Sequence, residues 1–387
     1  MGTLLMKIVI AINSFKNSMS SPDAGNAAAS GVRKAFGDEP VDIVVKPLAD
    51  GGEGTVDALV TGMNGEYRHV IVSGPLNERV DCVYGYLPET NTAIIEMAGA
   101  AGIGLVREAD RNPMNTSTYG VGEVIRDAMD SGIRNFIIGL GGSATNDCGV
   151  GMLQALGFVF CDKNGDPVGR GGKALKDVAR IDLTQVPEEL KKCRFKVACD
   201  VNNPLCGSNG CSYVYGPQKG ADPEMVQILD GYCAHFGEVT AEVLGNDFHE
   251  TEGAGAAGGM GFAFLSYLNA DLEPGIDIVM KEVHLEQELL NADYLITGEG
   301  RLDFQTAMGK GPIGVAKLAK KYGVKTIGLA GEVTKEAGEC NAKGLDAFFS
   351  VIPGAMNLED AMKHDVAVEN MTRTAEQVFR LIRAVTC

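Results

Sequence analysis

The sequence predicts an α/β protein of two domains. Short apolar runs of strand length alternate with segments whose apolar residues recur at helical spacing, and several runs end in loops rich in glycine and small polar residues. The chain has 387 residues, more than one ordinary core accommodates. From residue 69 the alternation gives way to three short β runs separated by Gly, Pro and Asn, which predict antiparallel pairing and a domain boundary near Ser73.

Composition narrows the class of protein. Hydrophobic residues make up 45% of the chain, which excludes a disordered chain, and the formal net charge of −17 disfavours nucleic-acid binding. An anionic substrate would need local basic residues, because the overall field repels it. No apolar stretch is long enough to span a membrane, and the short apolar start of the chain is interpreted as a first strand rather than a signal peptide.

The ten cysteines and five histidines are scattered, without a CxxC pair, and therefore do not favour a zinc site. Most of these cysteines are interpreted as small buried hydrophobic residues in a reducing compartment, which predicts a cytoplasmic location. The sequence leaves the oligomeric state open and is compatible with a homo-oligomer.

The first predicted strand covers residues 7–12 and runs into a loop that ends at a helix beginning near Pro22. Ser14 and Lys16 lie on this loop, and ligands of open α/β sheets bind at the carboxyl ends of strands. Lys16 is the loop's one cation, which suggests an anion contact; a solvated lysine is the alternative. A second strand, 41–47, leads to a glycine-rich turn at which Asp50 could bind a sugar-acid hydroxyl or a metal ion, or cap the next helix.

The stretch 136–151, FIIGLGGSATNDCGVG, predicts a strand, a glycine turn and a helix start, preceded by a helix over about 117–130. Such a turn directs several backbone N–H groups at one small volume, where an anion is stabilised. An ordinary strand-to-helix turn is the alternative. The predicted anion contacts are Gly141, Gly142, Ser143 and Thr145.

Another strand, 195–201, ends at Asp200, which is a candidate Mg²⁺ ligand or general base; an Asx turn is the alternative. Residues 253–259, GAGAAGG, match the GxGxxG spacing. No strand precedes them, so they predict a glycine-rich helix start packed against another backbone rather than a dinucleotide site.

The C-terminal part returns to βα alternation, with strands at 292–297, 326–330 and 347–352 and helices at 313–322 and 371–385. After the first of these strands, Arg301 is a candidate clamp for a carboxylate, because its planar fork pairs a carboxylate bidentately; a solvated arginine is the alternative. Asp303 and Lys310 follow. The spacing lacks the first glycine of GxxxxGK[ST], so this is not a P-loop.

Together these loops offer anion-binding amides, two cations and several carboxylates, which is what phosphoryl transfer to a hydroxyl requires. The segments IAINSFKNSMS, PLADGGEGT, GLGGSATNDCGVGMLQALG and TGEGRLDFQTAMGKGP resemble, in order, the hallmark segments of the bacterial glycerate kinases that include the glyoxylate- and galactarate-pathway enzymes. Cys148 stands where that pattern has glycine.

The resemblance implies an ATP- and Mg²⁺-dependent kinase acting on (R)-glycerate, with the 2-hydroxyl favoured as acceptor and the 3-hydroxyl as the alternative. It also implies a flavodoxin-like parallel-sheet domain formed by residues 1–73 and 285–387, an inserted mixed-sheet α/β domain formed by 74–284, and an active site in the cleft between them. Two other classes stay open: a noncatalytic sugar-acid sensor and an NAD(P)-dependent oxidoreductase.

Within this kinase hypothesis the predicted roles are as follows. Asp303 is the base, Lys16 stabilises the transferring phosphoryl group, and Asp200 holds the metal. Arg301, Asp50 and Ser14 contact the substrate. Gly141, Gly142, Ser143, Thr145 and Lys310 contact the nucleotide.

Overall fold

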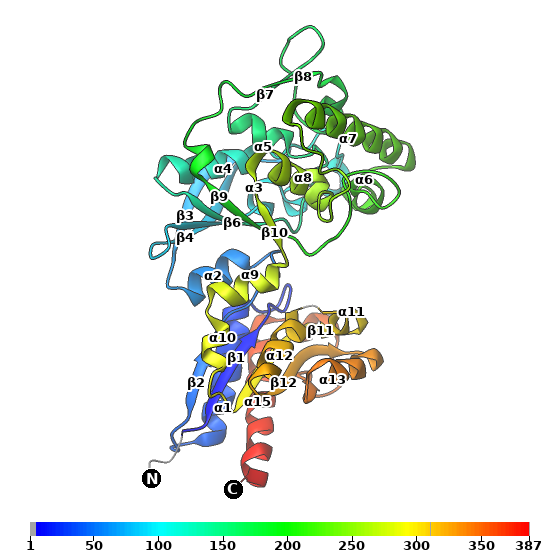
Figure 1. Ribbon diagram of the computed structural model, residues 1–387. Coiled ribbons are helices and arrows are strands. Elements are labelled where there is room, and N and C mark those ends of the chain that lie inside the picture. The colour runs from blue at the N-terminus through cyan, green and yellow to red at the C-terminus, as the bar shows by residue number, and fades with distance from the viewer. Residues whose placement is uncertain (1–4, 310, 387) are drawn as a thin grey trace. The chain divides into compact units, whose positions relative to one another are not determined.

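The computed structural model of the chain describes residues 5–309 and 311–386. They form two compact units, each with its own main sheet (Figure 1). Unit 1 comprises Met1–Asp50, Asp57–Asn64 and Ile276–Cys387, and unit 2 comprises Gly51–Val56 and Gly65–Gly275. The boundaries predicted near residues 73 and 284 each lie nine residues later in the chain, whereas the strand beginning at Glu66 belongs to unit 2.

Unit 1 contains a five-stranded parallel sheet with the order β13-β12-β11-β1-β2. Numbered within the unit, this order is 2-1-3-4-5, that of flavodoxin-like folds, as the resemblance implied. The strands are β1 (Lys7–Ile12), β2 (Asp42–Val45), β11 (Tyr294–Leu302), β12 (Lys325–Val333) and β13 (Ala347–Ser350). The helices are α1 (Ser21–Phe36), α2 (Thr55–Gly62), α9 (Gly275–Glu282), α10 (Leu285–Leu289), α11 (Phe304–Ala307), α12 (Gly311–Lys321), α13 (Glu339–Lys343), α14 (Leu358–Ala361) and α15 (His364–Thr386).

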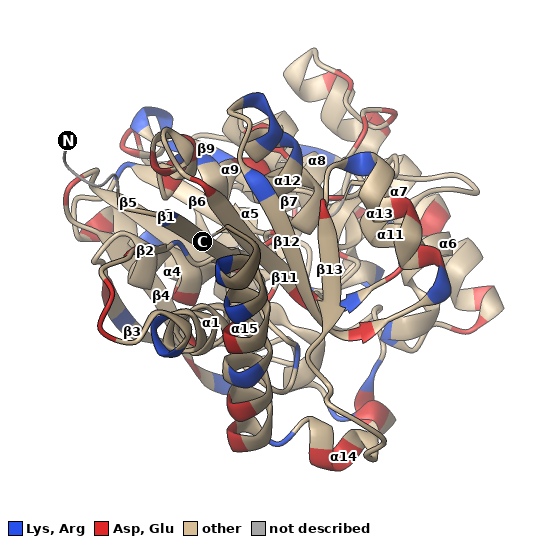
Figure 2. Ribbon diagram, turned by 90° about the horizontal axis from the view of Figure 1, so that it is seen from below, with Lys and Arg blue, Asp and Glu red and all other residues tan. Residues whose placement is uncertain are grey.

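Helices cover both faces of this sheet, as a parallel sheet requires. Side chains of β1 and β11 pack with α1 and α15 on one face, while α12 and α13 pack on the other. Ser20 caps α1, since its side chain accepts from the N–H of Asp23. The backbones of α1 and α15 approach closely at Gly31, where a Cβ would lie 2.1 Å from the carbonyl oxygen of Thr372. Basic and acidic residues are interspersed along α15 (Figure 2).

Unit 2 contains a mixed six-stranded sheet with the order β10-β9-β6-β5-β4-β3, in which β3, β4 and β5 are antiparallel and the remaining pairs are parallel. The predicted meander is thus confirmed. The strands are β3 (Glu66–Ser73), β4 (Arg79–Leu87), β5 (Thr92–Glu96), β6 (Asn135–Gly139), β9 (Arg194–Ala198) and β10 (Asp271–Glu273), with the separate pair β7 (Val159–Cys161) and β8 (Arg180–Asp182). The helices are α3 (Ala98–Ala101), α4 (Tyr119–Asp130), α5 (Val150–Ala155), α6 (Cys211–Tyr215), α7 (Pro223–Leu244) and α8 (Ala256–Leu268).

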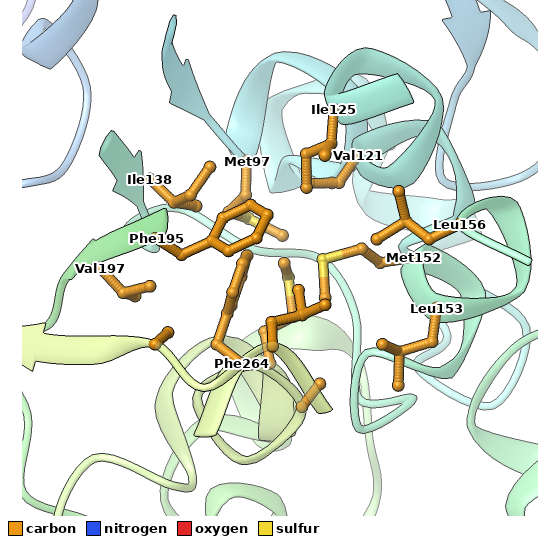
Figure 3. Packing of buried hydrophobic residues seen from close by; sticks show 14 of the residues in the cluster. Met97, Val121, Ile125, Ile138, Met152, Leu153, Leu156, Phe195, Val197 and Phe264 are labelled. Carbon is orange, nitrogen blue, oxygen red and sulfur yellow. The ribbon is translucent and has the colours of Figure 1, made fainter. Parts of the chain in front are cut away.

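The core of unit 2 lies between its sheet and the helices α4, α5 and α8 (Figure 3). Phe195 on β9 stacks on Phe136 of β6, with ring centroids 4.8 Å apart, and packs against Phe264 of α8. The glycine-rich start of α8 packs against another backbone as predicted. A Cβ at Gly258, whose φ is +68°, would lie 2.0 Å from the carbonyl oxygen of Thr145.

No helix within 5–309 or 311–386 combines the length and apolar character needed to cross a membrane.

Candidate active site

A cavity of about 750 Å³ lies at the carboxyl ends of β1 and β11 in unit 1. These two strands are neighbours in the sheet although they are far apart in the sequence. The strand order reverses between them, and open α/β sheets bind ligands at such a switch point. Five of the predicted site residues line this cavity: Ser14, Lys16, Asp50, Arg301 and Asp303.

The loop after β1 is held by the polar side chain at its start. Asn13 is buried; its N–H donates to the carbonyl oxygen of Gly298 at 2.8 Å, and its Oδ1 accepts from the N–H of Ser14 at 2.8 Å. The N–H of Phe15 donates to the carbonyl oxygen of Met19, which closes a tight turn. Lys16 lies exposed in this turn. Its ammonium group is therefore presented to the cavity by a loop fixed at both ends.

Arg301 lies near the end of β11, and Asp303 is the N-cap residue of α11. Asp303 Oδ1 accepts from the N–H groups of Gln305 and Thr306, at 2.8 and 3.2 Å, and so forms a capping box with Thr306. Its other oxygen, Oδ2, lies 3.6 Å from Arg301 Nε. Glu332 on β12 lies 3.5 Å from the same nitrogen. The Arg301 side chain is 58% exposed, so it is accessible to a ligand.

Sequence reasoning assigned no role to Glu299, Thr306 or Glu332, which also line the cavity. Thr306 Oγ1 donates to Glu299 Oε1 at 2.5 Å. Burial raises the pKa of the Cys340 thiol, and the negative charges of Glu299 and Asp303 raise it further. The capping box was readable from the spacing of Asp303 and Thr306, whereas Glu332 reaches the site only through the pairing of β11 with β12.

The loop between β6 and α5 lies in unit 2 and contains Gly141, Gly142, Ser143 and Thr145. Gly142 is exposed and has a φ of +77°. Thr145 is completely buried, and its carbonyl oxygen accepts from the Lys219 ammonium at 2.6 Å. The Thr145 hydroxyl is buried without a hydrogen-bond partner among the described residues, and its phosphate contact stays a prediction.

Asp147, on the same loop, is completely buried and accepts several hydrogen bonds. Burial raises the pKa of its carboxyl group, an effect opposed by hydrogen bonds from the N–H of Thr118 at 2.8 Å, from the Thr118 hydroxyl at 3.0 Å and from the N–H of Gly151 at 3.3 Å. Because Gly151 belongs to the first turn of α5, whose N-cap residue is Gly149, this carboxylate fixes the start of that helix. Its role in the fold is structural.

Asp200, also in unit 2, follows β9 and is exposed. Its Oδ1 accepts from the N–H of Gly275, the first residue of α9, at 2.9 Å. Lys310, the remaining predicted site residue, lies outside the described residues.

Carboxylates of the kind that Mg²⁺ binds lie at the site. Within the described ranges no three His, Cys, Asp or Glu side chains gather closely enough to hold a metal ion by themselves. Mg²⁺ is commonly held by one or two carboxylates together with substrate phosphates, and the cavity offers such carboxylates. The nine cysteines in the described part of the chain are free thiols.

Comparison with known proteins gives a consistent result. The model of the glycerate kinase family matches residues 8–383. The chain is 48% identical to a glycerate kinase of Bacillus subtilis over 378 residues, 98% of each chain, and 45% identical to a glycerate 2-kinase of Escherichia coli over 373 residues, 96% of this chain and 97% of that one. A crystal structure assigned to glycerate kinase 2 of Salmonella typhimurium LT2 has a TM-score of 0.90, 46% identity and 99% coverage of both chains. The chain belongs to the glycerate kinase family.

Proposed function

We propose that this protein transfers the γ-phosphoryl group of ATP to the 2-hydroxyl of (R)-glycerate. Membership of a kinase family implies the use of ATP. The 45% identity to an Escherichia coli protein named glycerate 2-kinase supports the choice of hydroxyl. The observation that carries the proposal is the cavity at the ends of β1 and β11, where Lys16, Arg301 and Asp303 meet.

In this proposal Arg301 binds the substrate carboxylate. Both of its ion pairs involve Nε, and we assign the two terminal nitrogens to the bidentate pair with glycerate. Ser14 and Asp50 bind the hydroxyl that does not react. Unit 1 corresponds to the domain built from both chain ends, and unit 2 to the inserted domain.

Asp303 is the proposed base. One of its oxygens is held by the helix cap, and the other accepts the proton of the 2-hydroxyl as the oxygen–phosphorus bond forms and the bond to ADP breaks. The cap fixes the carboxylate on a short, rigid turn, which favours a defined approach to the substrate.

Lys16 is proposed to stabilise the negative charge of the transferring phosphoryl group. The amides of Gly141, Gly142 and Ser143, and the side chain of Lys310, are proposed nucleotide contacts. Asp200 is the proposed carboxylate for Mg²⁺, which would neutralise phosphate charge when bound. The free thiols and the use of ATP fit a cytoplasmic location, which forms part of the proposal.

The test is ADP formation by the purified protein with ATP, Mg²⁺ and each glycerate enantiomer. Phosphorus NMR of the product separates the two acceptors, because a 2-phosphate couples to one proton and a 3-phosphate couples to two. The proposal expects the (R)-enantiomer and the 2-phosphate. A 3-phosphate would support the alternative acceptor, whereas glycerate binding without ADP formation would indicate a sensor.

A further inference from the structure

The cavity in unit 1 has two chemically different halves. The polar half comes from the ends of β1 and β11. The other half is apolar and comes from the chain that follows β13, together with Met19 on the loop after β1. Its lining residues after β13 are Val351, Ile352, Met356, Leu358, Ala361, Met362 and Ala367.

Size indicates that glycerate does not fill this cavity. Its volume of about 750 Å³ lies in the range of about 300–1,000 Å³ typical of pockets for much larger ligands. Glycerate has an oxygen on each of its three carbons and no apolar face. The apolar half therefore has no counterpart in that substrate.

The apolar half is buried at its floor and open at its rim. Val351 is 2% exposed and Met19 is 3% exposed, whereas Leu358 is 74% exposed and Met356 is 40% exposed. Exposed apolar surface that borders a cavity marks a surface for a ligand. Methionine side chains adapt to flat rings and make favourable sulfur–aromatic contacts.

This wall is attached firmly to the sheet. The N–H of Val351 donates to the carbonyl oxygen of Ala330 at 2.7 Å, and the Ser350 hydroxyl donates to the carbonyl oxygen of Gly331 at 3.1 Å. Asn357 caps α14 by accepting from the N–H of Asp360 at 2.7 Å. The start of the wall is thus bonded to the sheet, and Leu358 begins a helix that has a side-chain cap.

We propose that the apolar wall 351–362 binds the adenine ring of ATP, with the triphosphate directed toward Lys16. This inference rests on the proposed kinase activity, because ATP is the second substrate and adenine is its uncharged aromatic part. Lys16 supplies positive charge in the same cavity, which an anionic nucleotide needs in a protein of net charge −17. A single cavity thus offers both an apolar surface for the base and, in Lys16, a cation for the phosphates.

The first experiment observes adenosine directly. In the full-length protein with ¹³C-labelled methionine methyl groups, adenosine should shift the signals of Met356 and Met362. The signal of Met308, which is 81% exposed and does not line the cavity, should not move. If neither Met356 nor Met362 responds to saturating adenosine, the proposal is overturned.

The second experiment weakens the wall. Met356→Ser combined with Leu358→Ser should raise the Kd of ADP about tenfold, because two apolar side chains that the ring would cover are lost. The Kd of tripolyphosphate and the KM of glycerate should stay unchanged. Leu381→Ser is the matched control, since Leu381 is 60% exposed on α15 and does not line the cavity.

These experiments distinguish a failure of the adenine subsite from a failure of the proposed kinase activity. Glycerate phosphorylation with an unchanged Kd of ADP in the double variant would refute the adenine subsite and leave the kinase activity standing. Binding of ADP that weakens in the double variant, in a protein that does not phosphorylate glycerate, would retain the subsite and refute the proposed function.

Discussion

Lys219 should make the free energy of unfolding depend on pH, and the substitution Lys219→Met should remove that dependence. Its side chain is 2% exposed, and its ammonium donates to the carbonyl oxygen of Thr145. Burial lowers the pKa of Lys219 from 10.5 to about 8, although Cys211 and Asp147 partly oppose the shift. The folded protein therefore holds this proton less tightly than the unfolded chain does.

The sign follows from proton linkage. Below pH 8 both states are protonated and the full cost of burying the charge is present. Between about pH 8 and 10.5 the folded state has lost the proton and the unfolded state still binds it, so stability rises with pH. With these two pKa values and about 1.4 kcal/mol for each unit, the free energy of unfolding should gain about 2.5 kcal/mol from this group between about pH 7 and 10.

The measurement compares the wild type with Lys219→Met, which keeps the length of the side chain and removes the titration. Urea denaturation at a series of pH values should show the wild type gaining about 2.5 kcal/mol on the variant over that interval. Other titrating groups are common to both proteins and largely cancel in the difference. Lys176→Met, at an exposed lysine of unit 2, is the control and should follow the wild type. Parallel pH profiles for wild type and Lys219→Met would refute the reasoning.

The other predictions concern the site. Arg301→Lys should raise the KM of glycerate more than that of ATP in steady-state kinetics, because the charge remains and the fork is lost; an unchanged glycerate KM would remove Arg301 from the substrate site. Lys16→Ala should lower kcat by roughly 100-fold or more while thermal unfolding changes little, and normal turnover would indicate a solvated lysine. Asp303→Asn should abolish turnover while retaining ADP binding in calorimetry. Asp200→Asn should be partly rescued by excess Mg²⁺, and rescue of the Asp303 variant instead would mean that the two roles are reversed.

Local patterns in the sequence predicted most elements and several of their ends. The apolar run of β1, the proline at the start of α1 and the glycine-rich start of α8 are short-range features, and their physical causes lie within a few residues. The order of strands in unit 1 is different, because it depends on which buried faces pair. That order was predicted through the resemblance of whole segments to a family.

Chemistry at strand ends was also visible in the sequence, since Ser14, Lys16, Asp50, Arg301 and Asp303 follow apolar runs and prove to line one cavity. Sequence patterns do not separate a polar residue that faces a ligand from one that bonds inside the fold. Thr145 illustrates this point, because its burial results from packing in unit 2 and its carbonyl is bonded by Lys219, which is distant in the chain.

The sequence by itself thus determined the α/β class, the change to a meander from residue 69, and which residues could carry charge or bind an anion, because these depend on local periodicity and residue type. Only the tertiary structure decided which of those residues share a cavity, that Glu332 joins Arg301 across β11 and β12, and that the apolar residues after β13 form one wall of that cavity. Neighbours in a parallel sheet are set by long-range pairing and burial, and the spacing of residues along the chain does not record them.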